Sequence, residues 1–179
     1  SWRTRAHDPQ LRPVHLVRHP LPDADGAEVV TLVVIGVGND HRRDDGVGPA
    51  VAAAVAARRP WLRVICCAAE PTAILDAWEG ATRAVIVDAA APGTDGVPGR
   101  VRRSTLGDLA ETRAVSSHDL SLAQTYRLGR VLDRAPTEVV VITVDAADAG
   151  HGVGLSPAVA QAVPKATAMV LDELSRSRA

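Results

Sequence analysis

A glycine-rich turn between a strand and a helix is the feature that most restricts how this chain can fold. The segment from Gly36 to Gly48 reads Gly-Val-Gly-Asn-Asp-His-Arg-Arg-Asp-Asp-Gly-Val-Gly. It follows the apolar run Val29 to Ile35, which is typical of a buried strand, and it precedes Val47–Ala57, an Ala- and Val-rich run that predicts a helix. A buried strand that leads into a helix is typical of an α/β fold.

The charges in this turn argue against a phosphate site. A glycine-rich turn before a helix can hold an anion through its backbone N–H groups and the helix dipole. Here Asp44 and Asp45 stand at the start of the helix, where they would repel a phosphate and attract a cation or a protonated group. A dinucleotide fingerprint starting at Gly36 would also need glycine or alanine at position 41, which is His41. The turn therefore favours a metal ion or a proton.

Strand-like and helix-like segments alternate along the rest of the chain, which predicts a mostly parallel sheet covered on both faces. Among them, Gly99–Thr105 has the alternation of a half-exposed edge strand, which can run antiparallel to its neighbour. The further expected strands are Leu62–Ala68, Arg83–Ala89 and Glu138–Val144, and the further expected helices are Thr72–Trp78, Asp119–Asp133 and a last one that opens at Ser156-Pro157 and runs to about Leu174.

Composition narrows the class of protein. The chain has 179 residues, enough for one domain with a substantial core. Its net charge of −1 argues against a nucleic-acid surface or a polybasic membrane patch, and no apolar run reaches the ~20 residues that span a bilayer. The only cysteines, Cys66 and Cys67, are neighbours and poorly placed to pair with each other. We expect buried, reduced thiols in a cytoplasmic protein, and the polar amino terminus has no hydrophobic signal core.

The first 27 residues differ in character from the rest of the chain. They contain four prolines and three of the six histidines, without an apolar period. We expect residues 1–27 to form a flexible tail with solvated histidines, because no periodic apolar face is available for burial. Residues 28–179 are then expected to form a single α/β domain.

Several polar residues come directly after expected strands. Ligand sites of open α/β sheets lie outside the carboxyl ends of the strands, which here carry Asp45, Glu70 and Asp88. His118 stands at the start of a later helix. Two carboxylates and an imidazole suit a borderline divalent metal such as Ni²⁺ or Zn²⁺. Each residue also has an ordinary alternative: Asp45 can stabilise a helix amino terminus, Asp88 can cap a turn, and His118 can be a hydrogen-bonded loop histidine.

Six motifs along the chain, taken together, resemble one known family. They are the Gly36–Gly48 turn, Leu75-Asp76-Ala77-Trp78-Glu79-Gly80, Val85-Ile86-Val87-Asp88-Ala89, Pro92-Gly93, Ser116-Ser117-His118 and Gly154-Leu155-Ser156-Pro157. In this order, over roughly Val29 to Leu174, they resemble the hydrogenase maturation proteases. These endopeptidases trim the carboxyl-terminal tail from the large subunit of nickel–iron hydrogenases.

The resemblance implies a fold, a ligand set and a partner. The fold is a three-layer α/β/α sandwich with a twisted sheet. Carried onto this chain, the metal-binding and catalytic residues are Asp45, Asp88 and His118, with Asp45 at a position where some members have glutamate. The metal is nickel presented by the precursor of the hydrogenase large subunit, and zinc or another divalent ion can take its place in vitro. The resemblance assigns no role to Glu70 or His41.

Two mechanisms and one different function stay open at this point. The metal can polarise the scissile carbonyl or activate water. Alternatively, the protein only recognises nickel on the precursor, and Asp45 or Asp44 acts as general base, because one member of a crowded carboxylate pair has a raised pKa. The different function is a ligand-binding or scaffold domain without catalysis that uses the Gly36–Gly48 turn.

Overall fold

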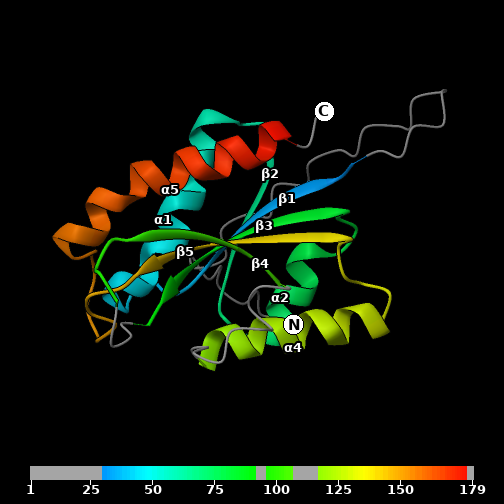
Figure 1. Cartoon of the computed structure of the whole chain (residues 1–179), viewed down its shortest axis with the longest axis horizontal. Coiled ribbons are helices and arrows are strands. Elements are labelled where there is room, and N and C mark those ends of the chain that lie inside the picture. The colour runs from blue at the N-terminus through cyan, green and yellow to red at the C-terminus, as the bar shows by residue number, and fades with distance from the viewer. Residues whose placement is uncertain (1–29, 92–95, 107–116, 177–179) are drawn as a thin grey trace, which may run out of the picture.

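The computed structural model describes residues 30–91, 96–106 and 117–176, and it describes the side chains of this last range from Leu122 onward. The expected tail, residues 1–27, lies outside the described residues. The elements are β1 (Leu32–Val37), the short 3₁₀ helix η1 (Arg43–Gly46), α1 (Val47–Arg58), β2 (Arg63–Cys67), α2 (Pro71–Trp78), β3 (Arg83–Ala90), β4 (Val101–Thr105), α4 (Ser117–Val131), β5 (Glu138–Asp145) and α5 (Pro157–Arg176) (Figure 1).

The five strands form one twisted sheet in the order β2-β1-β3-β5-β4 (Figure 1). Neighbouring strands are parallel except for β4, which runs antiparallel to β5 at the edge. The chain moves from β1 to β2 on one side and then returns to place β3 on the other side of β1. The carboxyl ends of β1 and β3 therefore flank the point where the strand order reverses, which is where open α/β sheets bind ligands.

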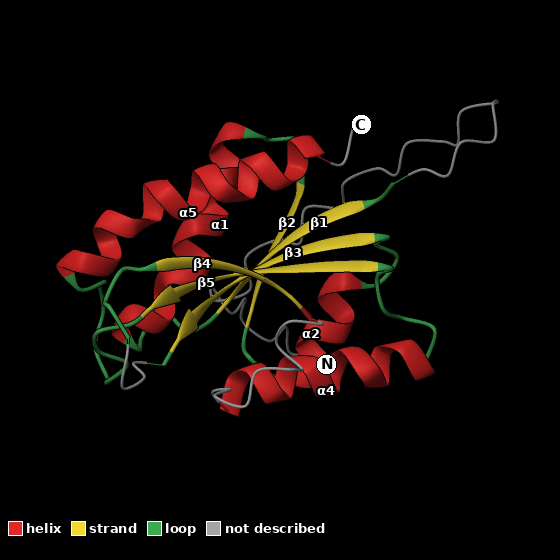
Figure 2. Ribbon diagram, in the orientation of Figure 1, coloured by secondary structure: helices red, strands yellow, loops and turns green. Residues whose placement is uncertain are grey.

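Helices cover both faces of this sheet, as Figure 2 shows. Helices α1 and α5 pack together on one face, and α2 and α4 pack together on the other. Along β3 the side chains alternate between the two layers: Val85 and Val87 pack beneath α1 and α5, whereas Ala84 and Ile86 pack beneath α2 and α4. The expected three-layer α/β/α fold and the antiparallel edge strand are confirmed.

The element bounds differ from the sequence-based expectation by a few residues. Strand β4 begins at Val101 rather than Gly99, because Gly99 has a φ of +78°, which regular strand backbone does not adopt. Helix α2 begins at Pro71, whose missing N–H costs nothing in a first helical turn. No described helix is long and apolar enough to cross a membrane.

The expectation of two buried cysteines is wrong for one of them. Cys67 is partly buried, but Cys66 is exposed, and neither forms a disulfide. Both lie near the end of β2, which among the described strands is an edge strand with a neighbour on one side only. Adjacent residues on a strand point to opposite faces, so only one of the two thiols can face the α2 layer.

Candidate functional site

Close contact between backbones fixes the turn that follows β1. A Cβ atom on Gly48 would lie 2.2 Å from the carbonyl oxygen of Val37 and 2.6 Å from that of Val87. Gly38 has a φ of +140°, and a Cβ there would lie 1.8 Å from the carbonyl oxygen of Asp45. These glycines let the start of α1 and the residues before it pack directly against the ends of β1 and β3. The acidic residues of the turn are thereby held at the carboxyl edge of the sheet.

Asp44 is a structural residue of this turn and is fully buried. Its carboxylate accepts hydrogen bonds from the backbone N–H groups of Ala147 (2.8 Å), Asp148 (2.9 Å) and Ser156 (2.6 Å), and from the hydroxyl of Ser156 (2.9 Å). Burial is the largest influence on its pKa and opposes ionisation, but these hydrogen bonds together outweigh it and lower the pKa of Asp44. The suggestion of Asp44 as a general base with a raised pKa is therefore wrong.

Asp45 is the acid of the pair that stays partly accessible. It lies in η1, which contacts β3, and its Oδ2 accepts a hydrogen bond from the backbone N–H of Asn39 at 3.0 Å. Asn39 in turn accepts a hydrogen bond from the backbone N–H of His41 through its own side chain. This chain of contacts orients Asp45 at the edge of the sheet and leaves its carboxylate half-buried.

Asp88 lies near the end of β3 on the face that α2 and α4 cover. It comes two residues after Ile86, which packs in that layer, so its side chain shares the same face. The carboxylate is half-buried and accepts a hydrogen bond from the backbone N–H of Ala89 at 2.8 Å. It also lies close enough to Cys67 to act on that thiol. Burial, then Cys66, then Asp88 raise the pKa of Cys67 to about 11.

Asp45, in the turn that follows β1, and Asp88, near the end of the adjacent strand β3, therefore lie at the same carboxyl end of the sheet. Residue 118 belongs to the first turn of α4, and the first turn of this helix lies toward the end of the sheet where β1 and β3 end (Figure 1). The side chain of His118 lies outside the described residues. Among the side chains that the structure describes, no three His, Cys, Asp or Glu residues could hold a metal ion. A site that includes His118 accordingly stays a prediction, in which the imidazole would be the ligand that suits nickel beside the two carboxylates.

Two further residues from the sequence analysis have mainly backbone roles. Glu70 is the exposed residue before α2, and its side chain makes no capping hydrogen bond. His41 is exposed, and its carbonyl oxygen accepts a hydrogen bond from Gly152. Neither arrangement indicates a chemical task.

A charged group beside Asp88 could not be identified from the sequence. Asp145, at the end of β5, is fully buried and forms ion pairs with Arg100 and Arg102. The register places Asp88, Thr143 and Arg102 in one row across three strands. Only the alternation in the expected edge strand Gly99–Thr105 hinted that these arginines share a face.

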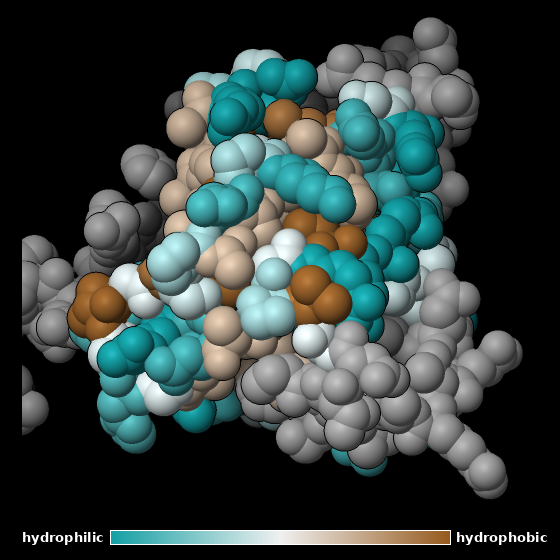
Figure 3. All heavy atoms as spheres, turned by 60° about the vertical axis from the view of Figure 1, so that its left-hand side comes forward, coloured by the Kyte–Doolittle hydropathy of each residue, from teal (hydrophilic) through white to brown (hydrophobic). Residues whose placement is uncertain are grey.

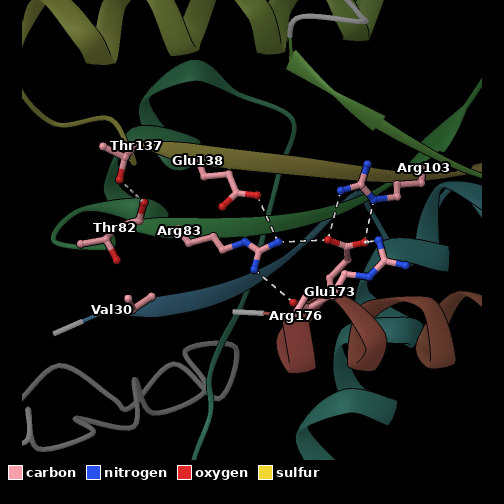
Figure 4. A pocket seen from close by; sticks show the side chains of 8 residues that line it. All are labelled: Val30, Thr82, Arg83, Arg103, Thr137, Glu138, Glu173 and Arg176. Carbon is pink, nitrogen blue, oxygen red and sulfur yellow. Dashed lines mark hydrogen bonds and ion pairs between the residues drawn. The ribbon is translucent and has the colours of Figure 1, made fainter. Parts of the chain in front are cut away.

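A cavity of about 500 Å³ opens beside the amino ends of β3 and β5, whereas Asp88 lies near the carboxyl end of β3. Figure 4 shows the side chains that line this cavity. The buried carboxylate of Glu173 lies in it and pairs with Arg83, Arg103 and Arg176. Arg83 also pairs with Glu138. These ion pairs join α5 to the amino ends of β3 and β5 and to β4, so we assign this cluster to the scaffold.

Comparisons with known proteins agree on one family. The sequence model of a family described as hydrogenase maturation protease matches residues 58–173, a range that contains Asp88 and His118 and begins after Asp45. No curated protein sequence matches the chain.

Solved structures share the fold. The hydrogenase maturating endopeptidase HybD from E. coli is 20% identical with a TM-score of 0.68, over 82% of this chain and 93% of that one. The [NiFe] hydrogenase maturation protease HybD from Thermococcus kodakarensis is 24% identical with a TM-score of 0.68, over 79% and 97%. The hydrogenase 2 maturation peptidase from a Thaumarchaeota archaeon is 25% identical with a TM-score of 0.58, over 80% and 97%.

Proposed function

Because this chain belongs to the hydrogenase maturation protease family, we propose that it cleaves the carboxyl-terminal extension from the large-subunit precursor of a nickel–iron hydrogenase, and only when the precursor carries nickel. The chain is an endopeptidase of hydrogenase maturation by family and fold. The nickel requirement is the part that we propose.

The position of Asp88 is the observation that best supports the nickel requirement. Its half-buried carboxylate lies near the carboxyl end of β3, beside the point where the strand order reverses. The turn that bears Asp45 packs against the ends of β1 and β3 at the same point. In our proposal Asp45, Asp88 and His118 hold the nickel of the bound precursor. A metal ion there would polarise the scissile carbonyl or lower the pKa of a bound water.

Asp45 has a second possible task. If nickel serves only for recognition, a general base must take the proton of the attacking water. Asp44 is unsuited, because all four of its hydrogen bonds hold the fold and its pKa is lowered. Asp45 is partly accessible and is therefore the carboxylate that we assign to this task.

A cysteine nucleophile is disfavoured at this edge. Cys67 lies near Asp88, but its pKa of about 11 keeps the thiol protonated and poorly nucleophilic at neutral pH. We also propose a cytoplasmic location, where the free thiols of Cys66 and Cys67 stay reduced.

The test is incubation with nickel-loaded and nickel-free precursor, followed by mass measurement of the product. We expect the parent to cleave only the nickel-loaded form, and Asp88→Asn or His118→Ala to abolish cleavage. Each change removes a metal ligand while leaving the hydrophobic core intact, so both variants should melt near the parent. Asp76→Asn, at an exposed acid of α2, and His151→Ala, at an exposed loop histidine, are matched controls that should cleave normally.

Two results would count against the nickel requirement. One is cleavage of the nickel-loaded precursor by Asp88→Asn at the parent rate. The other is cleavage of the nickel-free precursor by the parent as fast as the nickel-loaded one, which would indicate a protease that recognises peptide sequence alone. Binding of precursor without any cleavage would instead indicate a scaffold.

A further inference from the structure

The loop between β5 and α5, residues 146–156, holds the middle of the turn that bears Asp45. Gly38 and Gly48 fix the two ends of this turn against neighbouring strands. The four residues before Asp45 bond to the loop through their backbones instead. These contacts are a parallel bridge between Arg42 and Gly152 and hydrogen bonds from the N–H groups of Gly152, Arg43 and Asp44 to the carbonyl oxygens of His41 (3.0 Å), Gly152 (2.9 Å) and Asp148 (3.1 Å). One loop therefore determines the backbone path that leads to Asp45.

Arg43 has a strained backbone that this loop stabilises. Its φ of +46° lies in the left-handed region, which residues other than glycine rarely adopt. Its side chain lies across Gly152, where an added Cβ atom would come within 3.1 Å of Nε. Nε donates a hydrogen bond to the carbonyl oxygen of His151 at 3.3 Å, and Nη1 forms an ion pair with Asp148 Oδ2 at 3.1 Å. The loop thus holds Arg43 in a conformation that an arginine rarely adopts by itself.

The conformation of Arg43 determines where the next two side chains point. Arg43 is the first residue of η1, and successive residues of a 3₁₀ helix point about 120° apart. The Asp44 carboxylate points into the loop, where it accepts hydrogen bonds from three backbone N–H groups. The Asp45 carboxylate accepts one from the N–H of Asn39 and none from residues 146–156, all of which the structure describes. The loop therefore sets the direction of Asp45 without bonding to its carboxylate.

We propose that Asp148 is a positioning residue for Asp45. It contacts the turn with three groups, because its carboxylate pairs with Arg43 and its N–H and carbonyl oxygen both bond to Asp44. The proposal rests on the proposed function, in which Asp45 binds nickel or takes a proton from water. A displacement of ~1 Å in such a group can cost ~100-fold in rate, so the hold on Arg43 matters for kcat.

The ion pair between Arg43 and Asp148 contributes little to stability. The loop lies at the end of the molecule that Figure 3 turns forward, where hydrophilic residues reach the surface among hydrophobic ones. The two side chains are 51% and 46% exposed, and solvent screens the charges of such a pair. A change in the orientation of Asp45 can therefore be separated from a general loss of folding.

The variants for this test are Asp148→Asn, Arg43→Gly and Arg43→Lys. The control is Asp76→Asn, which removes an exposed ion pair between α2 and Arg134. Asp148→Asn loses the ion pair with Arg43, but its amide oxygen can still accept the hydrogen bond from the N–H of Gly150. Its effect is therefore confined to the contact with the turn.

Two measurements are made on each variant. Amide hydrogen exchange, measured by NMR, follows the N–H of Asn39, which is bonded to the Asp45 carboxylate. The N–H of Val34, in the buried middle of β1, reports on the fold as a whole. Cleavage of the nickel-loaded precursor then gives kcat and KM.

Exchange at Asn39 should become about five-fold faster, and kcat about five-fold lower, in Asp148→Asn, because the ion pair no longer holds Arg43. Both effects should reach at least about ten-fold in Arg43→Gly, since glycine can keep the left-handed backbone but adopts many others as well. Arg43→Lys, which can keep the ion pair, should stay within about two-fold of the parent. In all three, KM should stay within about two-fold of the parent, Val34 should exchange at the parent rate, and the melting temperature should change by less than about 4 °C. The control should match the parent throughout.

Parent-like exchange at Asn39 in both Asp148→Asn and Arg43→Gly would overturn the proposal, and so would faster exchange with an unchanged kcat. Equal acceleration at Val34 would show a general loss of folding and would overturn it as well. If Asp148→Asn does not fold, Arg43→Gly decides alone. Failure of the parent to cleave any precursor would refute the proposed function instead. Exchange at Asn39 needs no substrate and would still show whether Asp148 holds Asp45.

Discussion

Replacing Asp44 with asparagine should unfold this protein far more readily than the same change at the neighbouring Asp45. The Asp44 carboxylate is fully buried and meets only hydrogen-bond donors, three backbone N–H groups and the hydroxyl of Ser156. An asparagine has one oxygen to offer. In either orientation its NH₂ group faces at least one N–H donor, because both carboxylate oxygens accept backbone hydrogen bonds.

The size of the effect can be worked out from these contacts. The orientation that keeps the bonds from Ala147 and Asp148 leaves the N–H of Ser156 buried without an acceptor, which costs ~1–3 kcal/mol. The remaining bonds lose their charge-assisted character, at a further cost of roughly 1 kcal/mol each. The free energy of unfolding should fall by roughly 4–6 kcal/mol, a large part of the ~5–15 kcal/mol typical of a domain.

Urea denaturation of the parent, Asp44→Asn and Asp45→Asn measures this difference. Asp45→Asn is the matched control, because an amide oxygen can still accept the hydrogen bond from Asn39, and its cost should stay below ~1 kcal/mol. If Asp44→Asn is destabilised by no more than the control, the carboxylate does not hold the loops together as described.

The stability difference between the parent and Asp44→Asn should change with pH in a defined direction. Hydrogen bonding lowers the pKa of Asp44 in the folded state, so its contribution to stability is fully present above the unfolded pKa of about 4. That contribution is lost as the pH falls through the lowered folded-state pKa. The stability gap between the parent and Asp44→Asn should therefore narrow below about pH 4. A gap that stays constant with pH would show that Asp44 does not fold with a lowered pKa.

Other contacts lead to three further expected outcomes. Glu173→Ala should cost ~3–5 kcal/mol in urea denaturation, because it removes the buried anion that three arginines share, and a loss below ~1 kcal/mol would contradict that role. Gly48→Ala should yield little folded protein on circular dichroism, since its methyl group would overlap the Val87 carbonyl oxygen, and a normal melt would show that the backbone yields. Alkylation at pH 7.5 should label Cys66 well before Cys67, whose pKa is about 11 and which is partly buried, and equal labelling would contradict the difference in burial.

The strands and helices could be predicted because their signals are local. The apolar run Ala84–Val87 is bounded by Arg83 and Asp88, and Ser156-Pro157 marks the start of the last helix. The expectations from the sequence were wrong where tertiary contacts determine the local structure or the exposure of a side chain. Residues 43–46 form a separate 3₁₀ turn, because the glycine contacts with β1 and β3 fix their path before α1 begins. The exposure of Cys66 depends on the position of β2 at the sheet edge, which no local pattern reveals.

The candidate site likewise has features that the sequence could predict and features that only the fold reveals. Sequence placed Asp45 and Asp88 at the carboxyl edge, because residues after parallel strands share that edge. Residue chemistry alone could not separate the roles of Asp44 and Asp45, which are neighbours with the same side chain, and only the family resemblance favoured Asp45 as the ligand. The partners of Asp44 stand more than 100 residues later in the chain, and only the fold brings them near. The arginines beside Asp145 were missed for the same reason, since the strand register that aligns them with Asp88 is not visible in the sequence.

The position of β5 between β3 and β4 has a consequence for synthesis on the ribosome. Strand β4 leaves the ribosome before β5, with which it pairs, and one edge of β3 stays without this partner until residues 138–145 emerge. The loop that ties down Asp44 emerges later still, and α5 covers its face of the sheet last. Pairing between segments so distant in sequence is slow, because the intervening chain must first be closed into a loop. A nascent chain that stops before Glu138 therefore has a sheet with an unpaired edge, and its Asp44 turn lacks the loop that binds it. Synthesis of the segment from Glu138 onward is thus the step that commits the polypeptide to an active protease.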